Sequence, residues 1–208
     1  PFNGNANDES GNGHHGEAQG VTLVNDRHGS PTRAVEFARD GHRVVIPAND
    51  SIRGIADTHR TLSCWIFPVD QGGSHKYLIT RDGSLARQWY IVVSDETPAK
   101  VFIHSGGGAV HVPPDGWKGD RSVLTVRKGV WSHIVFSADQ LVEKIYINGD
   151  QVAAFPKSRW DTAPKDHPLV FGRSGSANQY FGGLDEVRFY NRVLSPAEVK
   201  SLYELEKP

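Results

Sequence analysis

The sequence predicts an all-β fold, a two-sheet antiparallel jelly-roll sandwich with one short helix near its C-terminal end. Two observations predict the sandwich: apolar residues come in short runs rich in β-branched and aromatic side chains, and Gly, Pro, Asn and Asp separate these runs. A third observation limits the helices, because only the segment from residue 196 onward repeats its apolar residues with a helical period. Short strands without helices between them are typical of sandwiches and jelly rolls.

The apolar runs expected to form strands cover residues 43–47, 62–67, 76–80, 89–93, 101–104, 123–126, 131–136 and 144–147. Asn148-Gly149 follows the last run, and because both residues tolerate positive φ this pair predicts a tight type I′ hairpin. Residues 105–108 are rich in Gly and residues 113–119 in Pro and Gly, so both stretches are expected to be loops.

The C-terminal segment carries the signals of a helix start. Ser195 is a good N-cap, Pro196 suits the first helical position, and Glu198 completes a capping box. The apolar residues that would share one face of this helix are Val199, Leu202 and Tyr203. We therefore expect a short helix that docks on the sandwich.

Length and charge favour a single domain over residues 1–208 and exclude two classes of partner. The chain of 208 residues can bury one sizeable core. Its formal net charge is −1, and basic and acidic residues alternate without forming the basic patch of a nucleic-acid-binding protein. No apolar run approaches the roughly 18 residues of a membrane-spanning helix. Nucleic acid and insertion into a membrane are therefore not expected.

Cysteine and methionine usage bear on processing and location. Cys64 is the only cysteine, so no intrachain disulfide can form, and its apolar neighbours predict a small buried side chain rather than a catalytic thiol. The sequence has no methionine and opens on Pro1. We interpret the chain as a piece of a larger, exported protein, secreted or displayed on a cell surface and of bacterial type, whose other domains are possible partners.

Four segments together resemble the laminin-G-like, concanavalin A-type lectin and glucanase jelly rolls. They are residues 2–13, 26–47, 131–149 and 181–199, which contain an Asp/Asn/Gly-rich opening loop, a central hairpin and a closing strand and helix. The order and spacing of these segments extend over nearly the whole chain. The first strand is shorter than the family pattern, and residues 113–121 and 156–166 are additional loop material. The resemblance implies the jelly-roll fold, but fold alone does not determine function.

A calcium ion is expected at the N-terminal loop. Residues Asn5 to Asn12 include Asp8 and several amide groups, and Ca²⁺ takes six to eight oxygen ligands from such groups. The resemblance implies that a structural Ca²⁺ ties the N-terminal segment to the last strand, with Asp185 as a side-chain ligand. The alternative is that the loop residues form Asx turns and that Asp185 accepts hydrogen bonds from backbone N–H groups.

Zinc is not expected. The neighbours His14 and His15 point to opposite faces of an extended segment, and no spaced set of His, Cys or carboxylate residues accompanies them.

Two sets of residues are candidates for contact with a glycan. Trp117, Arg159 and Trp160 lie in loop-like stretches, where an exposed aromatic ring can stack on a sugar, although either tryptophan could instead seal an edge of the sandwich. The second set comes from the middle strands and includes Trp89, His104 and Tyr180, with Arg81 and Arg87 nearby. Alternation along a strand means that this whole set cannot share one face. Trp65 and Trp131, inside predicted strands, are interpreted as packing residues.

No arrangement of residues predicts catalysis. The predicted strands contain almost no acids, whereas a retaining glycosidase needs two carboxyl groups about 5–5.5 Å apart. Asp185 and Glu186 are adjacent and should face opposite ways, and no nucleophile elbow is present. The sequence therefore favours a calcium-stabilised, non-catalytic module that binds a glycan or polysaccharide. A protein-interaction or spacer module of an adhesin or receptor is the alternative, followed by a divergent hydrolase or lyase.

Overall fold

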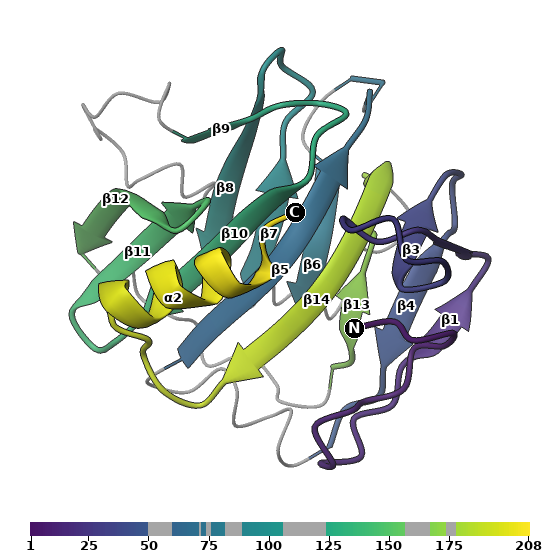
Figure 1. Ribbon diagram of the computed structural model, residues 1–208, viewed down its shortest axis with the longest axis horizontal. Coiled ribbons are helices and arrows are strands. Elements are labelled where there is room, and N and C mark those ends of the chain that lie inside the picture. Colours follow the sequence, from purple (N-terminus) through teal and green to yellow (C-terminus); the bar gives the residue numbers. More distant parts are fainter. Residues whose placement is uncertain are drawn as a thin grey trace.

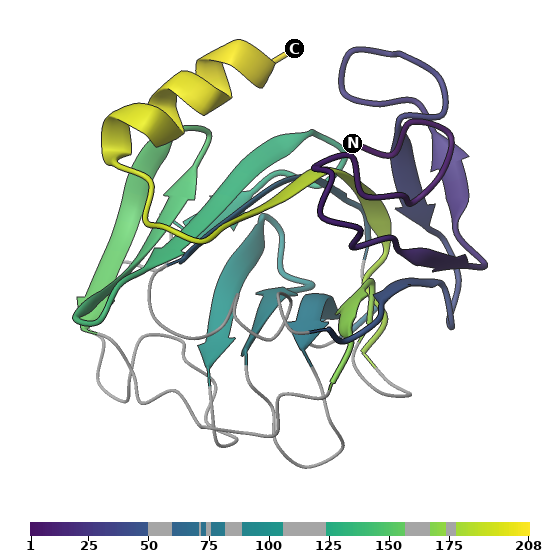
Figure 2. The ribbon, with the colours of Figure 1, turned by 90° about the horizontal axis from the view of Figure 1, so that it is seen from below.

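The structure is a computed structural model that describes residues 1–49, 60–70, 72–73, 76–81, 89–105, 124–156, 167–173 and 178–208, with only the backbone described for 89, 90 and 103–105. Within these residues the strands form two seven-stranded sheets, and every paired strand is antiparallel to its neighbour. The sheets pack face to face, with one helix on the outside of the second sheet (Figures 1 and 2). The predicted jelly-roll sandwich with a C-terminal helix is confirmed.

The first sheet contains, in spatial order, β1 (Glu17–Gln19), β4 (Arg43–Ile46), β13 (Leu169–Phe171), β6 (Lys76–Arg81), β7 (Trp89–Val93), β8 (Ala99–Ser105) and β9 (Thr125–Val126). The second contains β12 (Asp150–Pro156), β11 (Val142–Ile147), β10 (Ser132–Ala138), β5 (Arg60–Pro68), β14 (Gly182–Tyr190), β3 (Ala34–Phe37) and β2 (Thr22–Val24). In the described part of the chain, no helix is both long enough and apolar enough to cross a membrane.

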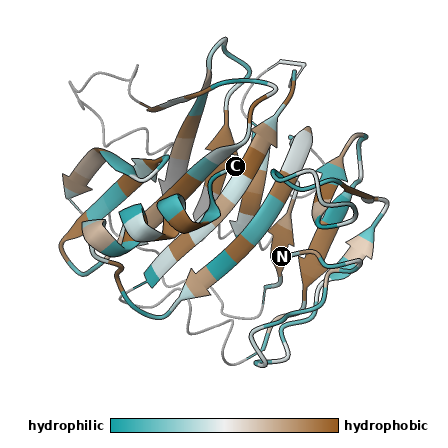
Figure 3. Ribbon diagram, viewed as in Figure 1, coloured by the Kyte–Doolittle hydropathy of each residue, from teal (hydrophilic) through white to brown (hydrophobic). Residues whose placement is uncertain are grey.

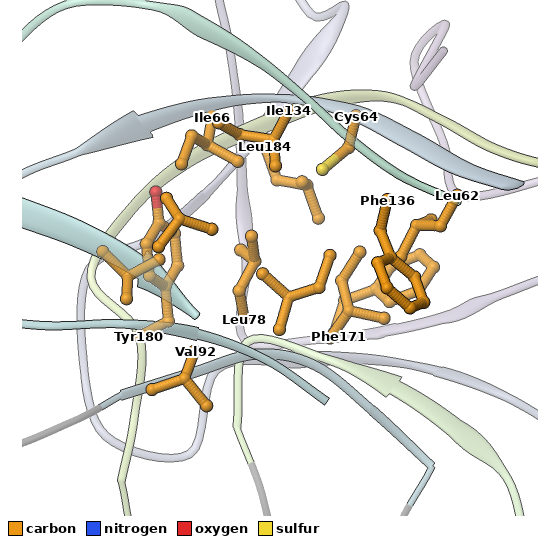
Figure 4. Packing of buried hydrophobic residues seen from close by; sticks show 14 of the residues in the cluster. Leu62, Cys64, Ile66, Leu78, Val92, Ile134, Phe136, Phe171, Tyr180 and Leu184 are labelled. Carbon is orange, nitrogen blue, oxygen red and sulfur yellow. The ribbon is translucent and has the colours of Figure 1, made fainter. Parts of the chain in front are cut away.

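The core lies between the two sheets, where alternate residues of facing strands meet (Figure 4). Leu62, Cys64 and Ile66 point inward from β5, and Ile134 and Phe136 do the same from β10. Cys64 is fully buried, which confirms the prediction of a small packed side chain. Burial raises the pKa of its thiol to about 12, so the group is not a reactive thiolate.

The local signals in the sequence produce the expected structures. Asn148 (φ 52°) and Gly149 (φ 83°) link β11 to β12, and both have the positive φ that a type I′ turn requires. The helix α2 (Pro196–Glu206) begins with the complete capping box of Ser195 and Glu198.

The helix α2 covers part of the outer face of the second sheet (Figure 1). Its residue Val199 is fully buried, and it belongs to the same apolar cluster as Val135 on β10 and Tyr146 on β11. Figure 3 shows hydrophobic and hydrophilic residues alternating along β14, as expected for a strand whose two faces have different surroundings. The outer face of β5, β10 and β14 is where the polar and aromatic side chains gather.

Candidate functional site

Two neighbouring rows of side chains cross the outer face of the second sheet. The strand register pairs Asp185 of β14 with Trp65 of β5, and Trp65 with His133 of β10. We call these three residues the covered row, because Tyr203 and Glu206 of α2 contact its members. The indole of Trp65 stacks on His133 (ring centroids 5.1 Å apart) and on Tyr203 (5.9 Å). Both Trp65 and His133 are buried, which confirms that Trp65 is a packing residue.

Every carboxylate of the covered row and its surroundings has a cationic partner. Arg27 donates a hydrogen bond from Nη1 to Oδ2 of Asp185 at 2.6 Å, and its guanidinium lies 5.0 Å from the Trp65 ring. Arg188 forms ion pairs with both Glu186 and Glu206. Burial, with a contribution from neighbouring Glu186, raises the pKa of Asp185 to about 6, although Arg27 opposes this rise. These carboxylates are structural groups held beneath or against the helix.

His133 of the covered row also forms a hydrogen bond with a serine of β5. Ser63 Oγ and His133 Nε2 are 2.8 Å apart. Burial, reinforced by the positive charges of Arg188 and Arg27, lowers the pKa of His133 to about 3, so its ring is neutral. Ser63 and His133 have no exposed surface. A substrate therefore cannot reach them while α2 is docked, and we assign them to packing.

The second row lies beside the first and is partly exposed. Gly183 of β14 pairs with Phe67 of β5, and Ser132 of β10 pairs with Ile66, so Trp131 comes next to Phe67. The rings of Phe67 and Trp131 are 5.5 Å apart and tilted by 54°. Both side chains are partly exposed. We call Gly183, Phe67 and Trp131 the open row.

The absence of a side chain at Gly183 lets the indole of Trp131 lie close to the backbone of the sheet. A Cβ atom at Gly183 would lie 2.8 Å from Cη2 and 3.2 Å from Cζ2 of Trp131. The six-membered ring of the indole therefore rests against the glycine, two strands away from its own backbone. An aromatic ring held against a sheet in this way presents a fixed apolar surface.

Apolar and charged groups surround the open row. Val130 is 47% exposed, and Val69, at the end of β5, is 37% exposed. Gly129 donates a backbone hydrogen bond to Pro68, which joins the two segments that carry these valines. Lys128 nearby is paired with Asp95 at 3.3 Å. The arrangement can accept the apolar face of a flat ligand and offers polar groups at its border.

Sequence reasoning missed this site because it assigned Trp131 to a buried strand. The residue instead immediately precedes β10, at the end of the ladder where the strand is no longer covered. Gly129 was the available signal, because a glycine marks a turn and Trp131, two residues later, therefore lies at the start of the strand and not inside it.

One predicted glycan-contact residue is a core residue. Tyr180 has no exposed surface, packs edge-on against Phe37 at 6.1 Å and donates its hydroxyl hydrogen to the carbonyl of Gly183 at 3.2 Å. Its prediction as a glycan contact is wrong, because the chain turns it inward just before β14.

The other predicted contacts are not tested. In the β7–β8 ladder Trp89 pairs with Ser105, and His104 pairs with Tyr90. Trp89 and His104 therefore belong to two consecutive residue pairs of the ladder and do not lie directly opposite each other. Trp117, Arg159 and Trp160 lie outside the described residues, as does Arg87.

The predicted calcium ligands make other contacts. Asp8 accepts hydrogen bonds from the Ser10 amide (2.9 Å), the Ser10 hydroxyl (2.9 Å) and the His14 amide (3.0 Å). Although partial burial acts to raise the pKa of Asp8, these hydrogen bonds together lower it to about 2. Asn5 accepts from the amide of Asn7, and Asn12 donates to Ser10.

Both carboxylate oxygens of Asp185 also have hydrogen-bond donors, since Arg27 donates to one and the Glu186 amide donates to the other. Among the described residues, no three His, Cys, Asp or Glu side chains come together as a metal site. The positively charged guanidinium of Arg27 is the cationic partner of the Asp185 carboxylate. These contacts are the ones expected under the alternative of Asx turns and hydrogen-bonded carboxylates. Calcium binding at Asn5, Asp8, Asn12 and Asp185 stays a prediction.

Solved structures with this architecture include carbohydrate-active proteins. Domain 4 of AbnA, a GH43 extracellular arabinanase from Geobacillus stearothermophilus, in complex with arabinotriose, is 19% identical with a TM-score of 0.71, covering 97% of this chain and 94% of that domain. The binding domain of botulinum neurotoxin serotype D is 15% identical with a TM-score of 0.66, covering 96% of this chain and 48% of that binding domain. At these identities the likeness establishes the fold alone.

A sialidase with a further activity shares the same fold. A mutant of Trypanosoma rangeli sialidase displaying trans-sialidase activity is 15% identical with a TM-score of 0.64, covering 90% of this chain and 29% of that protein. The family model Laminin_G_3 matches residues 40–200, most of the chain. The chain therefore belongs to the Laminin_G_3 family of the concanavalin A-like lectin/glucanases superfamily.

Proposed function

We propose that this protein is a non-catalytic glycan-binding module and that the open row is a contact site for the sugar. The observation that carries the proposal is the partly exposed indole of Trp131, held against Gly183 beside the ring of Phe67. Aromatic faces of this kind stack on the apolar C–H side of a sugar ring, while polar groups at the border bind its hydroxyls.

The comparisons support a role in carbohydrate recognition. The arabinanase domain, which matches nearly the whole chain, is described in complex with arabinotriose, and its parent enzyme is extracellular. By this analogy we propose that the protein acts outside the cell, where a binding module keeps its parent protein on a polysaccharide. The analogy rests on the fold, so the site itself must be tested.

A non-catalytic role is supported by the state of the carboxylates on this face. Asp185 is paired with Arg27, and Glu206 is paired with Arg188 and accepts from the indole N–H of Trp65. A glycosidase needs one carboxyl group as acid and one as base or nucleophile, both open to substrate. We therefore expect binding without hydrolysis, which chromatography of the bound oligosaccharide would check.

The experiment is a glycan array with matched tryptophan variants. We expect selective binding by the wild type, loss of binding in Trp131→Ala and partial retention in Trp131→Phe, because a phenyl ring still stacks on a sugar. Leu141→Ala is the control, since Leu141 is 76% exposed and lies in the turn between β10 and β11, at the opposite end of β10. Trp117→Ala and Trp160→Ala test the loop tryptophans that the sequence analysis singled out.

The array also tests the proposal as a whole. Silence of the folded wild type across a broad array would contradict glycan binding. Binding that Trp131→Ala preserves and Trp117→Ala or Trp160→Ala abolishes would keep the function and move the site to the loops.

Protein recognition is the second candidate function. Val69 and Val130 are exposed next to Trp131 and make this end of the sheet partly apolar, which is a feature of protein interfaces. Silence on the array, together with a partner protein whose binding Trp131→Ala abolishes, would favour this alternative.

Calcium is kept as a separate hypothesis. The expected ligands Asn5, Asp8, Asn12 and Asp185 have the other contacts described above, so we assign calcium no part in glycan binding.

A further inference from the structure

Glu36 of β3 lies next to Gly183, at the end of the open row opposite to Trp131 and Phe67. The register pairs Glu36 of β3 with Gly183 of β14, and Gly183 with Phe67 of β5. Neighbouring strands lie about 4.8 Å apart, so Glu36 and Phe67 stand about 10 Å apart on either side of the glycine. The indole tip of Trp131 lies over Gly183 itself. Glu36 is therefore the next side chain beyond the edge of the aromatic surface.

Glu36 differs from the other carboxylates of this face. Asp185 is paired with Arg27, and Glu186 and Glu206 with Arg188. Glu36 is partly exposed, and it makes no ion pair and no side-chain hydrogen bond with any residue that the structure describes. Its two carboxylate oxygens are therefore able to accept hydrogen bonds from a ligand.

A carboxylate at the edge of an aromatic ring has a definite chemical preference. A sugar that stacks on the indole directs its hydroxyl groups outward from the ring edge, and a carboxylate accepts hydrogen bonds from two neighbouring hydroxyls more strongly than a neutral group does. The same negative charge repels the carboxylate of a uronic or sialic acid and a sulfate ester. Thr22 of β2 is exposed and pairs with Glu36 of β3, so it extends the polar end of the row.

On these grounds we propose that the open row binds a neutral glycan, with Trp131 under one sugar ring and Glu36 accepting hydrogen bonds from its hydroxyls. The glycan chain would lie across the strands, from β10 toward β3 and Thr22. This inference rests on the proposed glycan-binding function and specifies the class of sugar and the residue that selects it.

The test compares neutral and acidic oligosaccharides of equal length. Isothermal titration would measure the binding of arabino-, galacto- and gluco-oligosaccharides on one side and of oligogalacturonates on the other. We expect the wild type to bind a neutral sugar at least tenfold more tightly than any oligogalacturonate. Glu36→Ala should weaken binding of the neutral sugar roughly tenfold, because one charged hydrogen-bonding group is lost. Glu36→Gln should reduce the discrimination against oligogalacturonate.

Two controls separate the possible failures. Glu17→Gln changes the charge equally at an exposed position of β1, in the other sheet, and should leave binding unchanged. Circular dichroism would check that each variant is folded.

The outcomes distinguish failure of this inference from failure of the proposed glycan-binding function. Neutral binding that depends on Trp131 but is the same in Glu36→Ala, or equal affinity for neutral and acidic sugars, would overturn this inference and leave the proposed function standing. No binding of any sugar by the folded wild type would overturn both.

Discussion

The covered row and the open row lie on the same three strands, two residues apart, and have opposite surroundings. Trp65, His133 and Asp185 form the first, and Phe67 on β5 and Trp131, directly before β10, occupy the corresponding positions in the second. The helix α2 covers the first row with Tyr203 and Glu206, whereas the second row lies toward the end of β5 where the helix does not reach (Figure 1). Two similar sets of aromatic residues therefore differ in exposure, and the proposed function assigns packing to the first and sugar contact to the second.

The residue on β14 marks the difference between the two rows. In the covered row it is Asp185, a charge that the fold satisfies with Arg27 from a loop 158 residues away. In the open row it is Gly183, whose missing side chain leaves space for an indole. A buried charge needs a partner of opposite charge, whereas a binding site needs a fixed surface that remains accessible.

The largest expected effect on stability comes from Trp65→Ala. This substitution removes the stack on His133 and Tyr203 and leaves the Glu206 carboxylate without its indole donor. We expect a loss of about 3–5 kcal/mol in the free energy of unfolding, measured by urea denaturation. Trp131→Ala, in the open row, should cost less than half as much, since its side chain is partly exposed. Equal losses would contradict the division into a packing row and a binding row.

Arg27→Met tests the ion pair of the covered row. The variant leaves the buried carboxylate of Asp185 without its cation, and we expect a loss of about 3 kcal/mol near neutral pH. The pKa of Asp185 is already raised to about 6, and removing Arg27 would raise it further, so the folded state can bind a proton as the pH falls. The deficit relative to the wild type should therefore shrink between neutral pH and about pH 5.

The double variant Arg27→Met with Asp185→Asn is the matched control, because it has no buried charge at this position. It should recover part of the stability at neutral pH and lose the pH-dependent deficit. A deficit that stays constant with pH would show that Arg27 stabilises the fold by packing alone.

His133 should make the protein sensitive to acid. The pKa of His133 is about 3 in the folded protein and has an ordinary value of 6.5, so between these values the unfolded chain binds a proton that the folded protein does not. Stability from this group is present above pH 6.5 and is lost as the pH falls, by up to about 1.4 kcal/mol per pH unit. Asp185, whose pKa shifts the other way, offsets part of this loss between its ordinary value of 3.8 and about 6.

The difference between wild type and His133→Gln isolates the histidine. Urea midpoints measured from neutral pH to about pH 4 should fall more steeply for the wild type than for the variant. Parallel curves would mean that the histidine ring can be protonated without leaving its stack.

The fold was predictable from the sequence because its signals are local. The alternation in β5, the Asn148-Gly149 turn and the capping box at Ser195 each depend on residues close together in the chain. The open row was not predictable in this way. Alternation places Trp131 on the same face as His133, but only the register with β5 and β14 brings Trp131 against Gly183, 52 residues further along.

The pairing of the charged groups was likewise not predictable from local sequence signals. The sequence identified Asp185 as a special residue but gave no indication that Arg27 would neutralise it, because that pairing depends on how a distant loop folds over the sheet. Tyr180 was misplaced for a related reason, since its inward direction is determined by the backbone just before β14.

Gly183→Ala should displace the Trp131 indole with only a small loss of stability. The new methyl group would meet the far end of the Trp131 side chain at 2.8 Å, and the indole can move away by rotating. We expect a change in the free energy of unfolding at the low end of the roughly 1–3 kcal/mol typical of overpacking, together with a clear loss of glycan affinity, because the stacking surface is displaced. Unchanged affinity in this variant would show that the position of the indole against the glycine is not needed for binding.

The smallest expected effect concerns calcium. The carboxylates of Asp8 and Asp185 already accept hydrogen bonds from their own loop or from Arg27, so the described contacts leave little for an added ion to stabilise. We expect the melting temperature to change by no more than about 1 °C between millimolar calcium and excess chelator, because a ligand stabilises the folded state only in proportion to its occupancy. A rise of several degrees that Asp8→Ala abolishes would restore calcium to the N-terminal loop. If Asp185→Asn abolished such a rise instead, Arg27 would have to leave its partner when the ion binds, and the covered row would be a cation site that the arginine fills in the absence of calcium.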